Sequence, residues 1–180
     1  MAQAAKTAPA DSLEANEYDG ITISLLTCGP GEEVYTLYGH TAIRICDTTR
    51  HADIVVNYGM FSFRQNFFVA RFILGLTDYM IGITSFGNFF DEYTYEGRWV
   101  YEQVLNLRRE EKKAIIAAID ENSKPENATY RYNCFYNNCT TRARDILTEN
   151  ISGKVGYAPE TCDAPSFREM CHGKTADHRW

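Results

Sequence analysis

Alternating apolar and polar residues mark four short segments of this chain as strands. Each segment alternates in hydrophobicity or is rich in β-branched residues, the pattern typical of a half-buried strand. The predicted strands cover residues 21–26, 41–45, 53–59 and 100–105. Turn-forming residues at 47–50 separate the second strand from the third, so residues 41–58 are predicted to form an antiparallel hairpin.

The helical spacing of apolar residues predicts three helices, at residues 64–75, 107–122 and 140–149. We expect Asn106 to cap the second of these helices. The pattern assigns no element to the aromatic-rich residues 85–96 or to the polar chain that follows Gly153.

These elements predict an α+β fold, in which helices pack on a small antiparallel sheet. A chain of 180 residues is long enough for one well-buried core. We therefore expect one domain over residues 18–180. Residues 1–17, which are mostly small or polar, are expected to form a disordered leader.

Composition narrows the range of functions. A hydrophobic share of 44% and a charged share of 23% are typical of a soluble globular protein. A net charge of −6 without a basic block argues against nucleic acid as a partner. The longest apolar stretch, residues 67–86, contains Arg71 and Asp78 and is not predicted to span a membrane.

The six cysteines contain no CxxC pair, which argues against a structural zinc site. No metal ion or cofactor is expected. Cys162 and Cys171 lie nine residues apart in the polar tail, where a disulfide and two buried thiols are equally compatible with the pattern.

Cys139 is the preferred candidate for a nucleophile. A nucleophilic cysteine needs a stabilised thiolate, and the N-terminus of a helix supplies unpaired N–H groups and a favourable dipole. Cys139 stands where the helix 140–149 begins, and Arg142 and Arg144 follow in its first turns. Cys134 is the rival, but no helix-start signal accompanies it. The remaining cysteines in turn-like positions are expected to be structural, namely Cys28 and Cys46.

His40 is the candidate base, because it alone of the four histidines enters a strand that should be half buried. A lone histidine in such a place is more often a core residue than a catalyst. In the predicted hairpin His40 lies opposite Gly59, with Asn57 as its diagonal neighbour and Asp53 further along the same face. Either could orient the imidazole, and Asn57 is the nearer. A slip of one residue would turn both to the other face.

The order of these residues resembles that of circularly permuted papain-like enzymes, which include permuted NlpC-type proteins and the lecithin:retinol acyltransferase group. Those enzymes carry a histidine on the first long strand, a polar partner on the next and a cysteine at a later helix start. Tyr132 and the pair Asn138-Cys139 look like that group's tyrosine and Asn-Cys element, where the tyrosine is associated with the oxyanion site. The resemblance implies a circularly permuted papain-like (NlpC-type) fold.

Six spaced elements extend the resemblance over residues 20–180. Together they look like the N-terminal periplasmic domain of the Lnb-type bacterial lipoprotein N-acyltransferase family of Bacteroides-like organisms. The elements are residues 26–31, 38–44, 57–61, 75–79, 125–127 and 138–142. In that family the domain precedes a membrane-embedded portion, of which these 180 residues contain nothing, so a membrane surface is an expected partner.

The resemblance implies a thiol acyltransferase of the periplasm or cell envelope. Cys139 would take an acyl group from a phospholipid or a diacylated lipoprotein and pass it to the amine of a lipoprotein's N-terminal cysteine. His40 would act first as base and then as acid, while the Cys139 N–H and Tyr132 would stabilise the oxyanion. The residues expected to bind substrate are Tyr38, Asn138 and Arg142. The alternatives are a cell-wall amidase or peptidase of the NlpC type, and a non-catalytic domain that binds lipid or lipoprotein.

Overall fold

An antiparallel sheet of six strands, in the order β5-β1-β2-β3-β4-β6, forms the centre of the described part of the chain. The computed structural model describes residues 17–33, 35–61, 67, 71, 76–153, 155–156 and 165–176. The strands are β1 (Ile21–Cys28), β2 (His40–Asp47), β3 (Ala52–Met60), β4 (Asp78–Ser85), β5 (Val100–Val104) and β6 (Thr129–Arg131).

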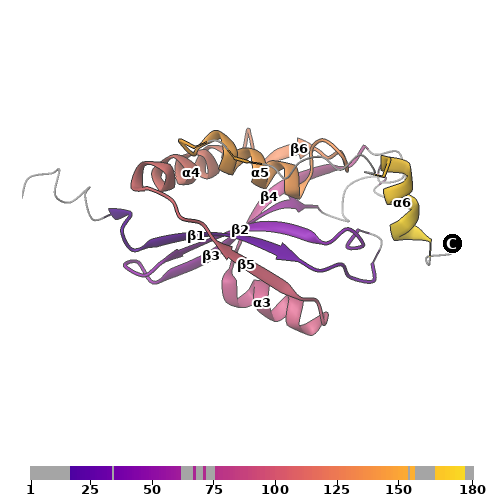
Figure 1. Ribbon diagram of the computed structural model, residues 1–180, viewed down its shortest axis with the longest axis horizontal. Coiled ribbons are helices and arrows are strands. Elements are labelled where there is room, and N and C mark those ends of the chain that lie inside the picture. Colours follow the sequence, from indigo (N-terminus) through magenta and orange to yellow (C-terminus); the bar gives the residue numbers. More distant parts are fainter. Residues whose placement is uncertain are drawn as a thin grey trace, which may run out of the picture.

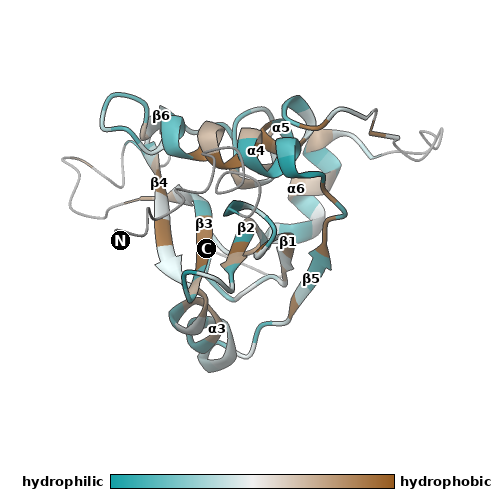
Figure 2. Ribbon diagram, turned by 90° about the vertical axis from the view of Figure 1, so that its left-hand side faces the viewer, coloured by the Kyte–Doolittle hydropathy of each residue, from teal (hydrophilic) through white to brown (hydrophobic). Residues whose placement is uncertain are grey.

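Helices cover both faces of this sheet. Helices α4 (Arg109–Asn122) and α5 (Cys139–Glu149) lie on one face, and α3 (Phe86–Tyr95) lies on the other (Figure 1). Figure 2 shows the strands side by side between these two layers. Helix α6 (Phe167–Thr175) lies beyond the ends of the strands (Figure 1). The predicted α+β class is confirmed.

The alternation of side chains along the strands creates two apolar clusters. Ile23, Ile43 and Val56 pack with residues of α4 and α5 in the larger cluster. On the opposite face, Leu26 and Val55 pack with the aromatic side chains of α3. Each fully buried side chain of this size stabilises the fold by about 1.5–3 kcal/mol, so both layers are held firmly on the sheet.

The predicted hairpin is confirmed, together with its register. Ala42 pairs with Asn57 and Asp47 with Ala52, so that residues 48–51 form the turn. The other predicted strands, residues 21–26 and 100–105, correspond to β1 and β5. The predicted helix 140–149 corresponds to α5.

The helix predicted at 107–122 is present as α4, but its cap was wrongly placed. The N-cap is Arg108, not Asn106. Leu105 still donates a backbone hydrogen bond to Ile23, so the strand pairing continues too far for a helix to begin at residue 107. Glu111 supplies the capping acceptor instead, because its carboxylate accepts the Arg108 N–H at 2.8 Å.

Four elements lie where the sequence pattern predicted none, namely α3, β4, β6 and α6. The predicted helix 64–75 and the predicted leader 1–17 fall outside the described residues, apart from Glu17, Phe67 and Arg71. Within the described residues, no helix is both long and apolar enough to cross a membrane.

Candidate active site

His40 is placed by the unusual backbone that precedes it. Gly39 has φ +74°, and a Cβ atom built on it would lie 2.5 Å from the carbonyl oxygen of Cys28. Only glycine fits such a turn without displacing the neighbouring strand. The chain therefore enters β2 close against β1, where His40 pairs with Cys28 and faces the end of β3.

Asn57 is the side chain that orients His40. Its Oδ1 lies 3.1 Å from His40 Nε2, which is the diagonal contact that the hairpin register predicts. Because an amide oxygen only accepts hydrogen bonds, Nε2 is the donor, and Nδ1 remains for another partner. Asp53, the alternative orienting residue, is instead paired with Arg44 at 2.6 Å.

Cys139 is the first residue of α5, and Asn138 builds the helix start around it. The Asn138 side chain accepts the Thr141 N–H at 2.9 Å, and the Thr141 hydroxyl accepts the Asn138 N–H at 2.8 Å. Asn138 Nδ2 donates to the Cys134 carbonyl at 2.9 Å. Asn138, a predicted substrate-binding residue, has the contacts of a helix cap in the structure, and these contacts fix the place of the cysteine.

Several groups around Cys139 stabilise its thiolate. Burial raises the pKa of this thiol, but a hydrogen bond and the charge of His40 lower it, helped by the Thr41 N–H and the Thr140 hydroxyl. The net result is a pKa of about 7 instead of 9.0. The lowered pKa increases the share of thiolate near neutral pH. The residue has the electronic character of a nucleophile.

Two other thiols, Cys134 and Cys28, have raised pKa values instead. Burial raises the pKa of Cys134, the rival nucleophile. Burial also raises the pKa of Cys28 to about 11, despite a hydrogen bond from Tyr93. Cys171 is a free thiol, whereas Cys162 lies outside the described residues. The direction of the pKa shift thus distinguishes Cys139 from Cys134. The sequence pattern alone gave only a preference for Cys139.

Two kinds of hydrogen-bond donor remain unused beside the thiol. The Cys139 and Thr140 N–H groups open α5 and have no partner among the described residues. Tyr132 stacks on Tyr79 at 4.1 Å, and its hydroxyl likewise has no partner in the described part of the chain. Burial and the nearby Cys139 raise the pKa of Tyr132, so its hydroxyl keeps its proton. These groups are placed to donate hydrogen bonds to an oxyanion formed at Cys139.

The two remaining predicted substrate-binding residues differ in their surroundings. Tyr38 is 56% exposed, two residues before His40, and its hydroxyl forms a hydrogen bond with the Cys171 thiol. Arg142 instead donates to Asn137 Oδ1 at 2.8 Å and lies over the Tyr130 ring at 4.0 Å. Its contacts hold the loop before α5 against β6.

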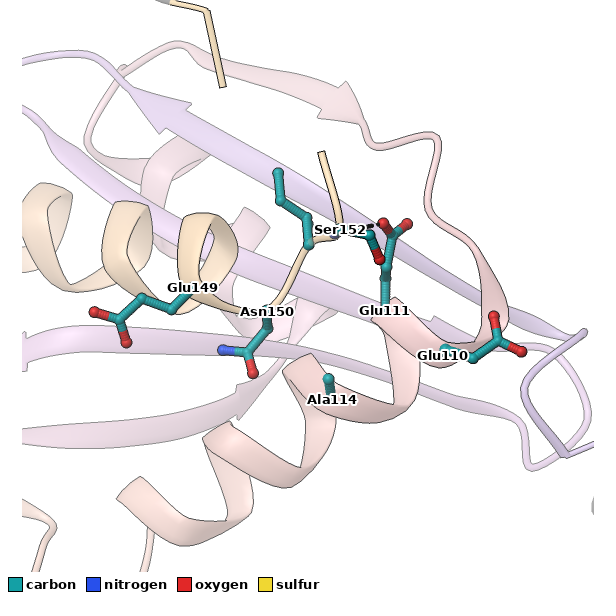
Figure 3. Close-up of a pocket in the computed structure, with 7 residues that line it drawn as sticks. Glu110, Glu111, Ala114, Glu149, Asn150 and Ser152 are labelled. Atoms are coloured by element: carbon teal, nitrogen blue, oxygen red, sulfur yellow. Dashed lines mark hydrogen bonds between the residues drawn. The ribbon is translucent and has the colours of Figure 1, made fainter. Parts of the chain in front are cut away.

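An open hollow lies at the other end of α5, away from Cys139 (Figure 3). It is lined by Glu110, Glu111, Ala114, Glu149, Asn150, Ile151 and Ser152. In Figure 3, Glu111 and Ser152 meet across it. The Ser152 N–H donates to Glu111 at 2.8 Å, so the most buried of these carboxylates already has its partners.

Sequence reasoning did not single out Gly39, Thr41 or Thr140, all of which adjoin His40 or Cys139. A glycine directly before the candidate histidine was a usable signal, because glycine often marks a close backbone approach. The roles of the two threonines depend on tertiary contact and carry no local signal.

Comparison with known proteins identifies the family. Residues 8–170 match the Lnb N-terminal periplasmic domain. No curated protein and no solved structure matches the chain. The match covers most of the 180 residues and indicates an Lnb-type lipoprotein-modifying protein with a periplasmic domain. The chain therefore belongs to the family of Lnb N-terminal periplasmic domains.

Proposed function

We propose that this domain is a cysteine acyltransferase that acts on bacterial lipoproteins, with Cys139 as nucleophile, His40 as acid and base, and Asn57 as the residue that orients His40. The observation that carries the proposal is the position of His40. Its Nε2 contacts Asn57 at 3.1 Å, and the same imidazole lowers the pKa of the Cys139 thiol. A nucleophile, a base and an orienting group in this order are the elements of nucleophilic acyl transfer.

In the first step, the Cys139 thiolate attacks the ester carbonyl of a phospholipid or another acylated lipid. The carbonyl oxygen becomes an oxyanion, for which the donors are the Cys139 N–H and the Tyr132 hydroxyl, neither of which has a partner among the described residues. The carbon–oxygen bond of the ester then breaks. Protonated His40 gives its proton to the departing alkoxide, and the acyl group remains on Cys139 as a thioester.

In the second step, the amine of a lipoprotein's N-terminal cysteine attacks the thioester. Neutral His40 removes a proton from the attacking nitrogen as the new amide bond forms. The carbon–sulfur bond breaks, and Cys139 leaves as a thiolate. A pKa of about 7 makes Cys139 both a good attacking group and a good leaving group near neutral pH.

The fold that we propose is a circularly permuted papain-like (NlpC-type) one. Its support is the chain order of the site: His40 opens β2, Asn57 lies on β3, and Cys139 opens α5, which packs on the same sheet. The match to a periplasmic domain supports an activity located at the cell envelope. The membrane surface and the lipid substrates remain part of the proposal, as does a domain spanning residues 18–180.

The proposal is tested by mass spectrometry of lipoprotein N-termini from cells whose natural full-length protein carries Cys139→Ala. N-acylation should disappear in these cells and persist in cells with the matched variant Cys134→Ala. In purified wild-type protein, an acyl adduct on Cys139 that hydroxylamine removes would identify the thioester.

The alternatives give different results in the same tests. Unchanged N-acylation with Cys139→Ala, in cells that lack any second N-acyltransferase, would exclude the acyltransferase. Cleavage of cell-wall peptides that requires Cys139 would instead favour an amidase or peptidase. A Cys139 thiol that alkylates no faster than Cys134 would favour a domain that only binds.

A further inference from the structure

A hydrogen bond joins the residues that follow the candidate base and the candidate nucleophile. Thr41 Oγ1 and Thr140 Oγ1 lie 2.9 Å apart, although the two residues are 99 positions apart in the sequence. Thr41 comes directly after His40 on β2, and Thr140 comes directly after Cys139 on α5. Among the described residues, this bond joins β2 and α5 together with the contacts of the Cys139 thiol with His40 and with the Thr41 N–H.

Both threonines also act on the thiol itself. The Thr41 N–H and the Thr140 hydroxyl each lower the pKa of Cys139. Thr140 Oγ1 lies 4.0 Å from Cys139 Sγ. Thr41 is only 9% exposed, so its hydroxyl has little access to water if Thr140 is removed.

Apolar packing alone does not fix this geometry well. Helix α5 rests on the sheet through Ala143, Ile146 and Leu147, and contacts of this kind are non-directional. A hydrogen bond has a defined length and angle, and so it limits sliding of the helix start along β2. A displacement of about 1 Å at a catalytic pair can reduce the rate by about 100-fold.

We propose that Thr41 and Thr140 form a clamp that sets the separation of His40 and Cys139, and that both are positioning residues of the reaction. This inference rests on the proposed function for its effect on acyl transfer. Its effect on the thiol does not depend on that function, because the ionisation of Cys139 can be measured without any acyl substrate.

The test compares Thr41→Val and Thr140→Val with the wild-type protein, and each with its serine variant. Valine keeps the shape and removes the hydroxyl. We expect the pH midpoint of Cys139 alkylation to move upward by about one unit in each valine variant, and serine to restore it. In the full-length protein, kcat should fall about tenfold with KM changed less than about twofold.

The double variant Thr41→Val/Thr140→Val should be no worse than the more affected single variant, because both changes break the same bond. Thr148→Val is the matched control, since this hydroxyl bonds only within α5, to the Asp145 carbonyl at 3.5 Å. Thr140 is exposed, so its valine variant tests the bond even if the change at buried Thr41 prevents folding.

An unchanged alkylation midpoint in Thr140→Val would overturn the clamp, as would additive losses in the double variant. A loss that serine fails to restore, accompanied by a lower melting temperature, would also overturn it in favour of a purely structural role. A shifted midpoint in a protein that transfers no acyl group would retain the clamp and reject the proposed function instead.

Discussion

Polar groups lie at both ends of α5, but the two ends differ in whether these groups already have hydrogen-bond partners within the fold. At the C-terminal end, the hollow beside Ser152 has carboxylates on its walls (Figure 3). There Glu111 accepts the N–H groups of Arg108 and Ser152, both at 2.8 Å. At the N-terminal end, the partners of Cys139 stabilise its anion, while the Cys139 N–H and the Tyr132 hydroxyl stay without partners among the described residues.

The difference teaches that the hollow at the C-terminal end of α5 is not a candidate site by its shape alone. The hollow is concave and acidic, but its best-buried carboxylate has the contacts of a helix cap. The helix start around Cys139 combines a lowered thiol pKa with donors that are free to meet a developing charge. Perturbed ionisation together with unused donors is a stronger indication of chemistry than concavity.

Among the variants that keep both Cys139 and His40, the largest effect should come from Gly39→Ala, which disturbs the placement of His40 without changing its side chain. The added Cβ would lie 2.5 Å from the Cys28 carbonyl, at a φ of +74°. We expect acyl transfer to fall about 100-fold. The melting temperature should also fall, because strain of this kind costs about 1–3 kcal/mol. Steady-state kinetics and thermal unfolding measure the two losses.

Gly97→Ala is the matched control for this change. Gly97 has φ +65°, but a Cβ there would meet nothing within 4 Å. It therefore carries similar backbone strain without the contact to a strand. If Gly97→Ala reduces acyl transfer as much as Gly39→Ala does, strain alone explains the loss, and the placement of His40 by Gly39 is disproved.

A second large effect should follow removal of the imidazole by His40→Ala. In the wild-type protein, the rate of Cys139 alkylation should rise as the pH passes through about 7 and level off above it. The direction follows from the lowered pKa, because the thiolate is the reactive form and exists above that value. The rate at Cys134, whose pKa is raised, should still be rising above pH 9.

Without His40, burial is opposed only by the Thr41 N–H and the Thr140 hydroxyl, so the pKa of Cys139 should rise. The alkylation rate at pH 7 should then fall roughly 10- to 50-fold. Rates at individual cysteines can be followed by mass spectrometry across a pH series. A midpoint that stays near 7 in His40→Ala would show that the helix start, rather than the imidazole, stabilises the thiolate.

A smaller effect should follow Asn57→Ala, which leaves His40 in place but removes its orienting partner. We expect acyl transfer to fall about tenfold, since misorientation reduces acid–base catalysis without abolishing it. Asp53→Ala is the matched control on the same strand, because Asp53 pairs with Arg44 and not with His40. Equal losses in both variants would point to general weakening of β3.

The contact of Asn57 with His40 and the position of Cys139 at a helix start followed from local sequence patterns. The turn predicted at residues 47–50, which lies at residues 48–51 in the structure, and the alternation on either side set the hairpin register, and the register set the contact of Asn57 with His40. The start of α5 at Cys139 was likewise predictable, from the helical periodicity of the apolar residues that follow it. Local rules work here because turns and helix caps involve residues close in sequence.

The rest of the site could not be read in this way. The clash that makes Gly39 necessary is with the carbonyl of Cys28 on another strand, and the partner of Thr41 is Thr140 on α5. The pKa of Cys139 depends on His40, far away in the sequence. The sequence pattern also failed to predict α3, because the aromatic residues Phe89 and Tyr93 fit a buried helix and a buried strand equally well.

The smallest effect on chemistry should come from Glu111→Ala, at the other end of α5. The change removes the acceptor of two backbone N–H groups, so the melting temperature should fall by a few degrees. The pKa of Glu111 is lowered from 4.5, chiefly by the Arg108 and Ser152 N–H groups. Its stabilisation is therefore present above pH 4.5 and is lost as the pH falls through the lower, folded-state value. Alkylation of Cys139 at 25 °C should not change. A slower alkylation in folded Glu111→Ala would mean that the two ends of α5 are coupled, and the contrast between them would fail.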